Sequence, residues 1–216
     1  MCGICGIVDW AVDEPVDVSV LKRMVSQVSH RGPDGYGIVV DGSVGLGHSR
    51  LSIVDLTGGA QPMANEDETL WIVFNGEIYN HIELRPDLES KGHRFSTSCD
   101  TECILHLYEE YGERCLEFLN GQFAFVIWDR VNRRVFMARD RLGVRPLFYS
   151  TLGNRLVFAS EVKSLLVVPG VSARIDPIGL DQTFTFWSPQ APRSAFEGIS
   201  QLPPAHYAIW TEHGAR

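Results

Sequence analysis

The sequence lacks the features that would place the chain in a membrane or on a nucleic acid. Its 216 residues contain no apolar run of the roughly 20 residues needed to cross a bilayer. The formal net charge is −8 and no basic cluster occurs, which excludes the usual footprint of nucleic-acid binding. The N-terminus shows no basic start followed by an apolar stretch and a small-residue cleavage site. We therefore expect a cytoplasmic protein without membrane or nucleic-acid partners.

Cysteine and histidine are too scattered to predict a disulfide framework or a metal site. The five cysteines form an odd, unpatterned set, as expected in a reducing cytosol: Cys2, Cys5, Cys99, Cys103 and Cys115. If residues 3–8 form a strand, Cys2 and Cys5 face opposite sides of it and cannot share a metal. The seven histidines lack ligand spacing. No glycine-rich loop joins a strand to a helix, so we expect neither a metal nor a nucleotide cofactor in this chain.

Hydrophobic periodicity predicts one α+β domain over residues 1–216, with antiparallel sheets covered by helices. The predicted strands are residues 4–8, 36–40, 44–48, 69–74, 122–128, 134–138, 147–150, 155–159 and 207–210. The predicted helices are residues 18–28, 80–85, 101–111 and 161–167.

Several boundaries follow from individual residues. Asp41-Gly42 predicts a hairpin turn, and Asn75-Gly76 is expected to end the strand before it. Pro86 should end the helix capped by Asn80 or begin a second one. The four strands between residues 122 and 159 are expected to form one meander. Residues 170–216 are expected to be a proline-rich segment leading toward a further domain.

The residue behind the initiator methionine carries the chemistry of most interest. Methionine aminopeptidase removes Met1 when the second residue is small, and Cys2 is small enough. The product has a thiol with a pKa of about 8.5 beside an α-amine with a pKa of about 7.7–8.0. An amine that accepts the proton of a neighbouring thiol is the pairing that covalent catalysis needs. The alternative is a frayed terminus whose cysteine is a small apolar residue.

Two further stretches offer groups that bind polar substrates, although each also has an ordinary structural interpretation. The Asn75 amide and the Gly76 N–H are donors of the kind that form an oxyanion hole, but Asn-Gly is also a common hairpin turn. Arg50 could bind a carboxylate with two parallel hydrogen bonds, or form a surface salt bridge. Asp100 is equally a helix N-cap, and Glu77 a solvated loop charge.

Together these groups match an amino acid that bears a side-chain carboxamide. The Arg50 guanidinium suits the α-carboxylate of such an amino acid, and the carboxylates of Glu77 and Asp100 suit its α-ammonium. The donors of Asn75 and Gly76 suit its amide oxygen. The thiol would then attack the amide carbon.

At this point the chain resembles a known family, the glutaminase domain of class II glutamine amidotransferases, within the N-terminal-nucleophile hydrolases. It most resembles the branch of glutamine-hydrolysing asparagine synthetases. The matching stretches are MCGI at residues 1–4, HRGPDG at 30–35, HSRLSIVD at 48–55, NGEIYN at 75–80, DTE at 100–102 and RDRLGVRPL at 139–147. They occur in the family's order over nearly the whole chain.

The resemblance implies a four-layer αββα sandwich of two antiparallel sheets between helical layers. It implies hydrolysis of L-glutamine to L-glutamate and ammonia through a thioester on Cys2, with the oxyanion held by Asn75 and Gly76. It further implies that Arg50 binds the α-carboxylate and that Glu77 and Asp100 hold the α-ammonium. The backbone of Leu51 and Ile53 would line the pocket.

The resemblance also implies partners outside this chain. In the intact family enzyme, ammonia passes to a synthetase domain that activates aspartate with ATP and magnesium. The phosphate loop of that domain is absent from this sequence, so the chain is expected to be an excised half or a free-standing glutaminase. A homodimer is one expected state. Two alternatives stay open: a non-catalytic module with this fold, and an enzyme that acts on another amide or amidates a carboxylate other than aspartate.

Overall fold

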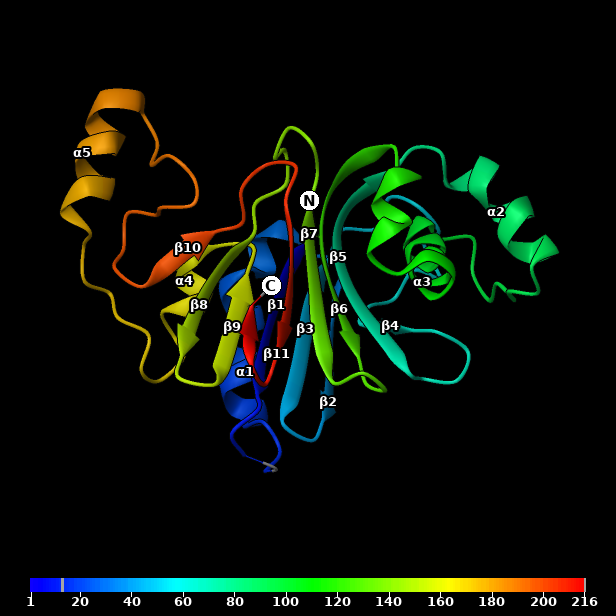
Figure 1. The fold of residues 1–216 in the computed structure, drawn as a ribbon, viewed down its shortest axis with the longest axis horizontal. Helices are drawn as coiled ribbons and strands as arrows, with labels where there is room; N and C mark the ends of the chain where they lie inside the picture. The colour runs from blue at the N-terminus through cyan, green and yellow to red at the C-terminus, as the bar shows by residue number, and fades with distance from the viewer. Residues whose placement is uncertain (13, 216) are drawn as a thin grey trace.

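The chain folds into two antiparallel sheets that stack face to face between helices (Figure 1). The computed structural model describes residues 1–12 and 14–215; Asp13 and Arg216 lie outside the described residues. The first sheet has six strands, in spatial order β10 (Ile199–Gln201), β8 (Phe148–Leu152), β9 (Arg155–Ala159), β1 (Gly3–Asp9), β3 (Val44–Arg50) and β2 (Gly35–Asp41). The second has the order β12 (Gly214–Ala215), β11 (Tyr207–Thr211), β7 (Arg134–Arg139), β6 (Gly121–Asp129), β5 (Leu70–Ile78) and β4 (Met63–Ala64).

Helices cover the outer face of each sheet. The α-helices are α1 (Val18–Gln27), α2 (His81–Ser90), α3 (Asp100–Tyr111), α4 (Val162–Leu165) and α5 (Pro177–Phe186), and the two 3-10 helices are η1 (Ser29–Arg31) and η2 (Gly112–Glu117). In Figure 1, α2 and α3 lie outside β4–β6, and α5 stands at the opposite end of the molecule beyond β10. The expected αββα arrangement is confirmed. No helix among the described residues is both long and apolar enough to traverse a bilayer.

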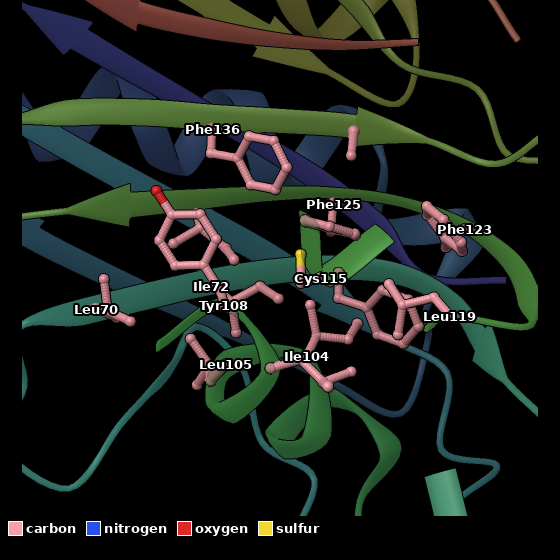
Figure 2. Close-up of a cluster of buried hydrophobic side chains, with 14 of the residues drawn as sticks. Leu70, Ile72, Ile104, Leu105, Tyr108, Cys115, Leu119, Phe123, Phe125 and Phe136 are labelled. Atoms are coloured by element: carbon pink, nitrogen blue, oxygen red, sulfur yellow. The ribbon is translucent and has the colours of Figure 1, made fainter. Parts of the chain in front are cut away.

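Three layers of apolar side chains hold these sheets and helices together. Alternate residues of β1 and β3, such as Ile4 and Leu46, pack between the sheets against Val126 of β6. The other face of the first sheet packs against α1 and α4. The other face of the second sheet packs against α3 and η2, where Phe125 and Phe136 meet the helical side chains (Figure 2).

Regular periodicity predicted the element types correctly where it was strong. The strand expected at residues 4–8 is β1, and the helix expected at 18–28 is α1, which begins at an Asp17 side chain that accepts a hydrogen bond from the Ser19 N–H. The hairpin at Asp41-Gly42 is confirmed, with Asp41 paired to Val44 and Gly42 at a φ of 54°. A positive φ at this turn suits glycine, which has no Cβ to clash.

Two predictions from turn and breaker residues were wrong, and one helix was missed. Asn75-Gly76 does not end a strand, because β5 continues through it to Ile78 and pairs with β6 along its whole length. Pro86 lies inside α2 and neither ends it nor starts another helix. Pro177 occupies the first turn of α5, a helix absent from the prediction, where the Asp176 side chain accepts a hydrogen bond from the Ile178 N–H.

The expected single meander is also wrong. The chain passes from the second sheet to the first between β7 and β8, so residues 122–139 and 148–159 belong to different sheets. Of the segment after residue 170, β10 joins the first sheet while β11 and β12 extend the second. The local hydrophobic pattern predicts that a segment is a strand, but the sheet that the strand joins depends on packing between distant segments.

One buried hydrogen bond links the two sheets. His48 of β3 is fully buried, and its Nε2 lies 3.2 Å from the Phe74 carbonyl oxygen of β5. Since a carbonyl only accepts, Nε2–H must donate. Burial lowers the pKa of His48 to about 4, despite the favourable effect of the Phe74 carbonyl, so the imidazole is neutral at pH 7.

This shift predicts acid sensitivity. Between pH 6.5 and about 4 the unfolded chain binds a proton at His48 that the folded chain does not, so the free energy of unfolding falls as the pH falls through that window. The expected loss is roughly 3 kcal/mol. Urea unfolding across this range should show a flatter profile for His48→Gln than for the unmodified protein. The exposed His213→Gln is the control, and parallel profiles for all three proteins would contradict the assignment.

Candidate active site

Strand pairing brings Cys2 beside the end of β3. The register of β1 against β3 matches Gly3 with Ser49, so the residue before β1 comes next to Arg50 and Leu51. The Cys2 Sγ lies 3.4 Å from the Leu51 nitrogen, which donates to it, and 3.6 Å from the Leu51 carbonyl oxygen. The thiol is therefore fixed against one peptide unit. The other cysteine of the pair, Cys5, is buried against α1, as the strand period predicted.

The backbone of Cys2 is held by an arginine from the turn after α1. Arg31 Nε donates to the Cys2 carbonyl oxygen over 2.9 Å, and its Nη1 pairs with Glu161 Oε1 at 2.9 Å. The ion pair with Glu161 orients the Arg31 guanidinium toward the start of β1. Residues 30–35 were noted from the sequence as a stretch shared with the family, and no role was assigned to Arg31. Only its place in the stretch shared with the family could have indicated one.

The edge of β5 presents a row of backbone N–H groups to the site. Phe123 of β6 bonds on both its backbone groups to Asp140, so its partner in register, Gly76, is in a non-hydrogen-bonded pair and turns its N–H away from β6. Phe74 and Ile78 turn the same way. The Phe74 N–H donates to Gln61 Oε1 at 2.6 Å, and the Ile78 N–H donates to Asp100 Oδ2 at 2.9 Å. Between these two bonds, the Gly76 N–H faces the pocket.

Asn75 adds a second unpaired group at the same place. Its side chain is fully buried, and neither Oδ1 nor Nδ2 has a hydrogen-bond partner among the described residues. An unpaired buried amide costs about 1–3 kcal/mol, so this group is poised for a ligand. A Cβ on Gly76 would come within 2.2 Å of the Gln122 carbonyl oxygen, so the glycine is required by packing against β6.

The loop after β3 holds the Arg50 guanidinium in place. Arg50 donates from Nη1 and Nη2 to the carbonyl oxygens of Leu56 and Asp55. Asp55 in turn accepts from the N–H groups of Gly58 and Ser98, which fixes the loop. A Cβ on Gly59 would lie 2.7 Å from Arg50 Nη2, so a larger residue would displace the guanidinium. Arg50 is thus bound by backbone carbonyls, and the expected alternative of a surface salt bridge is not what the described residues show.

Two carboxylates complete the polar lining. Asp100 is the first residue of α3 and is 3% exposed; its Oδ1 also receives the Cys99 Sγ–H at 3.4 Å. The helix N-cap position belongs to Cys99, so the N-cap interpretation of Asp100 was wrong. Burial raises the pKa of Asp100 even though the Ile78 N–H opposes that shift. Glu77 is half-buried on β5 and is no solvated loop charge.

All eight residues singled out from the sequence line one pocket, namely Cys2, Arg50, Leu51, Ile53, Asn75, Gly76, Glu77 and Asp100. The sequence analysis missed several other members, among them Met1, Gln61, Thr101 and Arg145. The cavity of this pocket has a volume of about 40 Å³, and Met1 is one of its walls. A cavity of that size holds a few water molecules. Side chains with metal-ligand spacing occur elsewhere among the described residues and not here.

Arg145 is the most informative of the missed residues. It is 9% exposed, its Nε is buried without a partner, and no salt bridge to its guanidinium occurs among the described residues. Asp140 holds only its backbone, by accepting the Arg145 N–H at 3.1 Å. A buried cation without a counter-ion is costly, which marks a site built for an anion.

The thiol itself is protonated at rest. Burial raises the pKa of the Cys2 thiol, while the Leu51 N–H, the ammonium of the retained Met1 and the nearby Arg50 and Arg145 guanidinium groups favour the thiolate. Because burial dominates, the thiol needs a base at neutral pH. This fits a nucleophile that gives its proton to a neighbouring amine.

Comparison with known proteins agrees with this geometry. The family model for the glutamine amidotransferase domain matches residues 1–216. The chain is 41% identical over 217 residues to asparagine synthetase [glutamine-hydrolyzing] 3 of Bacillus subtilis, covering 99% of this chain and 35% of that protein. It is 44% identical over 171 residues to asparagine synthetase [glutamine-hydrolyzing] 2 of Oryza sativa subsp. japonica, covering 76% of this chain and 28% of that one.

The solved structures show the same fold. The glutamine phosphoribosylpyrophosphate amidotransferase of B. subtilis, solved with ADP and GMP, superposes with a TM-score of 0.71 at 22% identity over all of this chain and 48% of that one. This chain therefore belongs to the glutamine amidotransferase domain family. It spans about a third of the length of the curated relatives it matches.

Arg145 supplies a prediction about the nucleophile. Removing its charge by Arg145→Met should disfavour the Cys2 thiolate, so alkylation by iodoacetamide should require higher pH and slow several-fold at pH 7. The rate is measured by mass spectrometry on protein that has lost Met1. Arg141→Met is the matched control, since that guanidinium donates to the Leu119 carbonyl oxygen. Unchanged alkylation in Arg145→Met would show that its charge does not reach the thiol.

Proposed function

We propose that this domain hydrolyses L-glutamine to L-glutamate and ammonia through a thioester on Cys2. The main observation is the pocket that joins the half-buried Cys2 thiol, an unpaired Asn75 amide and a free Gly76 N–H to two guanidinium groups and two carboxylates. Glutamine is complementary to this set in both charge and hydrogen bonding.

The proposed reaction begins when Cys2 Sγ attacks the carboxamide carbon and its proton passes to the α-amine of the same residue. The carbonyl oxygen becomes an oxyanion that accepts hydrogen bonds from Asn75 Nδ2 and the Gly76 N–H. The ammonium then protonates the leaving nitrogen, the carbon–nitrogen bond breaks, and ammonia departs. Water attacks the resulting thioester, which releases glutamate and restores the thiol.

Recognition of the amino-acid end would fall to the other polar residues. Arg50 is already held by the carbonyl oxygens of Asp55 and Leu56, so little entropy is lost when its remaining donors bind the α-carboxylate. Glu77 and Asp100 would accept hydrogen bonds from the α-ammonium. Leu51 and Ile53 form the wall beside the reacting carbon.

Removal of Met1 is a condition of this mechanism for two reasons. While Met1 remains, the nitrogen of Cys2 is an amide and cannot take up a proton. Met1 is also one wall of the pocket, so its loss enlarges a cavity too small for glutamine.

The names of the relatives support a proposal for the destination of the ammonia. Because this chain matches only about a third of each asparagine synthetase, we propose that it feeds an ATP-dependent synthetase domain or subunit, with ATP and magnesium bound there. Aspartate is the acceptor that those names indicate. A different carboxylate acceptor would leave every residue of the glutaminase pocket in the same role.

The nucleophile is tested by covalent labelling. Protein lacking Met1 should release ammonia from glutamine and gain one adduct from a diazo-ketone analogue of glutamine, as read by mass spectrometry. Cys2→Ala should lose both, while Cys115→Ala, which removes a buried thiol, should retain the adduct. Glutamine binding without ammonia release by the Met1-free protein would instead indicate a non-catalytic module.

The carboxylate partner is tested by substrate discrimination. Arg50→Met removes a charged hydrogen-bond donor, so kcat/KM for glutamine should fall on the order of 100-fold. Turnover of a simple primary amide without an α-carboxylate should not change. The matched control is Arg114→Met, an exposed arginine paired with Glu117. Equal turnover of both amides by the unmodified protein would show that the pocket does not select free amino acids.

A further inference from the structure

A second cluster of titratable side chains lies at α3, outside the pocket lined by Cys2. It combines residues from three places in the fold: Glu66 from the loop after β4, His93 from the connection between α2 and α3, and His106 from α3 itself. One ligand atom of each lies within 4.8 Å of those of the other two. The sequence analysis dismissed the histidines because they lack ligand spacing, but spacing along the chain does not limit residues that the fold brings together.

A fourth group stands between the two imidazoles. Glu109 Oε2 lies 2.8 Å from His106 Nδ1 and 3.4 Å from His93 Nδ1. Glu66 Oε2 lies 3.8 Å from the same His106 nitrogen. Ligand atoms around a tetrahedral zinc ion with bonds of about 2.1 Å are roughly 3.4 Å apart. These three separations lie on either side of that value, so side-chain rotations would be needed to place all four groups around one ion.

The outward-facing atoms of this cluster are already fixed by other contacts. Glu109 Oε1 accepts from Asn65 Nδ2 at 2.7 Å, and Glu66 Oε1 accepts from the Arg94 N–H at 3.0 Å. Each carboxylate thus keeps one oxygen on the protein and directs the other at the histidines. His93 Nε2 faces Glu110 Oε1 at 3.1 Å, which is the carboxylate–histidine arrangement that orients metal-binding imidazoles.

Burial distinguishes this cluster from an ordinary acidic surface. The His106 side chain is only 1% exposed, and its Nε2 has no partner among the described residues. Its Nδ1 is directed at two carboxylates. Two neutral imidazoles and two carboxylates would balance the charge of a divalent cation, and imidazole nitrogens and carboxylate oxygens are both donors that zinc accepts.

We propose that Glu66, His93, His106 and Glu109 form a structural site for a divalent transition metal of the zinc type. The ion would join the loop after β4 and the α2–α3 connection to α3, the helix whose first residue is Asp100. Its function would be to stabilise this side of the domain. It takes no part in chemistry at Cys2 and stands independently of the proposed glutaminase activity.

The test uses Cys2→Ala protein, so that the active-site thiol cannot bind the metal. After dialysis against a chelator, calorimetric titration with Zn²⁺ should show one site per chain, and added Zn²⁺ should raise the thermal unfolding midpoint. Co²⁺ in its place should give the visible absorption of a four-coordinate ion.

Variants identify the ligands. Glu66→Gln alters an exposed side chain that the fold tolerates, and it should weaken Zn²⁺ binding by more than about 100-fold, beyond the 10–100-fold effect of an outer partner. His93→Ala should do the same, whereas Glu110→Gln should lie within that smaller range. The matched controls Glu117→Gln and His213→Ala should bind Zn²⁺ unchanged. Absence of saturable binding, or binding unaffected by both Glu66→Gln and His93→Ala, would overturn the proposal and leave a hydrogen-bonded cluster.

Discussion

The whole site depends on how residue 2 is held at the start of β1. Arg31 donates a hydrogen bond to the Cys2 carbonyl oxygen, and the Leu51 N–H donates one to the Cys2 sulfur. Arg31 is itself aimed by Glu161, which follows β9, so elements from three regions of the chain converge on one residue. A terminal residue is ordinarily mobile. Here these contacts convert it into a group with a defined position, which a nucleophile requires.

The second constraint is an uncovered strand edge. The neighbour of β5, strand β4, has only two residues and pairs near the start of β5, which leaves the rest of that edge free. Exposed backbone groups at such an edge normally invite pairing with another strand. Here Gln61 and Asp100 occupy the N–H groups on either side, while that of Gly76 stays open to a ligand. The same carboxylate that occupies the Ile78 N–H is thereby placed to meet a substrate ammonium, so one contact serves both the fold and the pocket.

The sequence alone was sufficient to predict the residues of the site, because their chemical types match one ligand. The residues at 2, 50, 75, 77 and 100 were singled out because their types match one ligand, and all of them line one pocket. Prediction from the sequence was wrong where one local signal is compatible with two backbone structures. Asn-Gly is a turn signal only when no partner strand is available, and pairing with β6 carries β5 straight through it. Pro86 was expected to end a helix or begin one but lies inside α2, and the proline-rich segment after residue 170 contains the helix α5, which begins at Pro177. Arg145 and the cluster around His106 could not be found from spacing, because only tertiary packing removes their partners or brings them together.

The central claim is that Cys2 acts with its own α-amine as the base, and it is tested most directly by varying only what precedes that residue. Two preparations of the protein, one beginning at Cys2 and one with the Cys2 nitrogen still in a peptide bond, are compared for ammonia release from glutamine at pH 7. The account predicts that the blocked protein is slower by about 10²–10⁴-fold, the contribution of a positioned general base. Equal rates from the two preparations would contradict it.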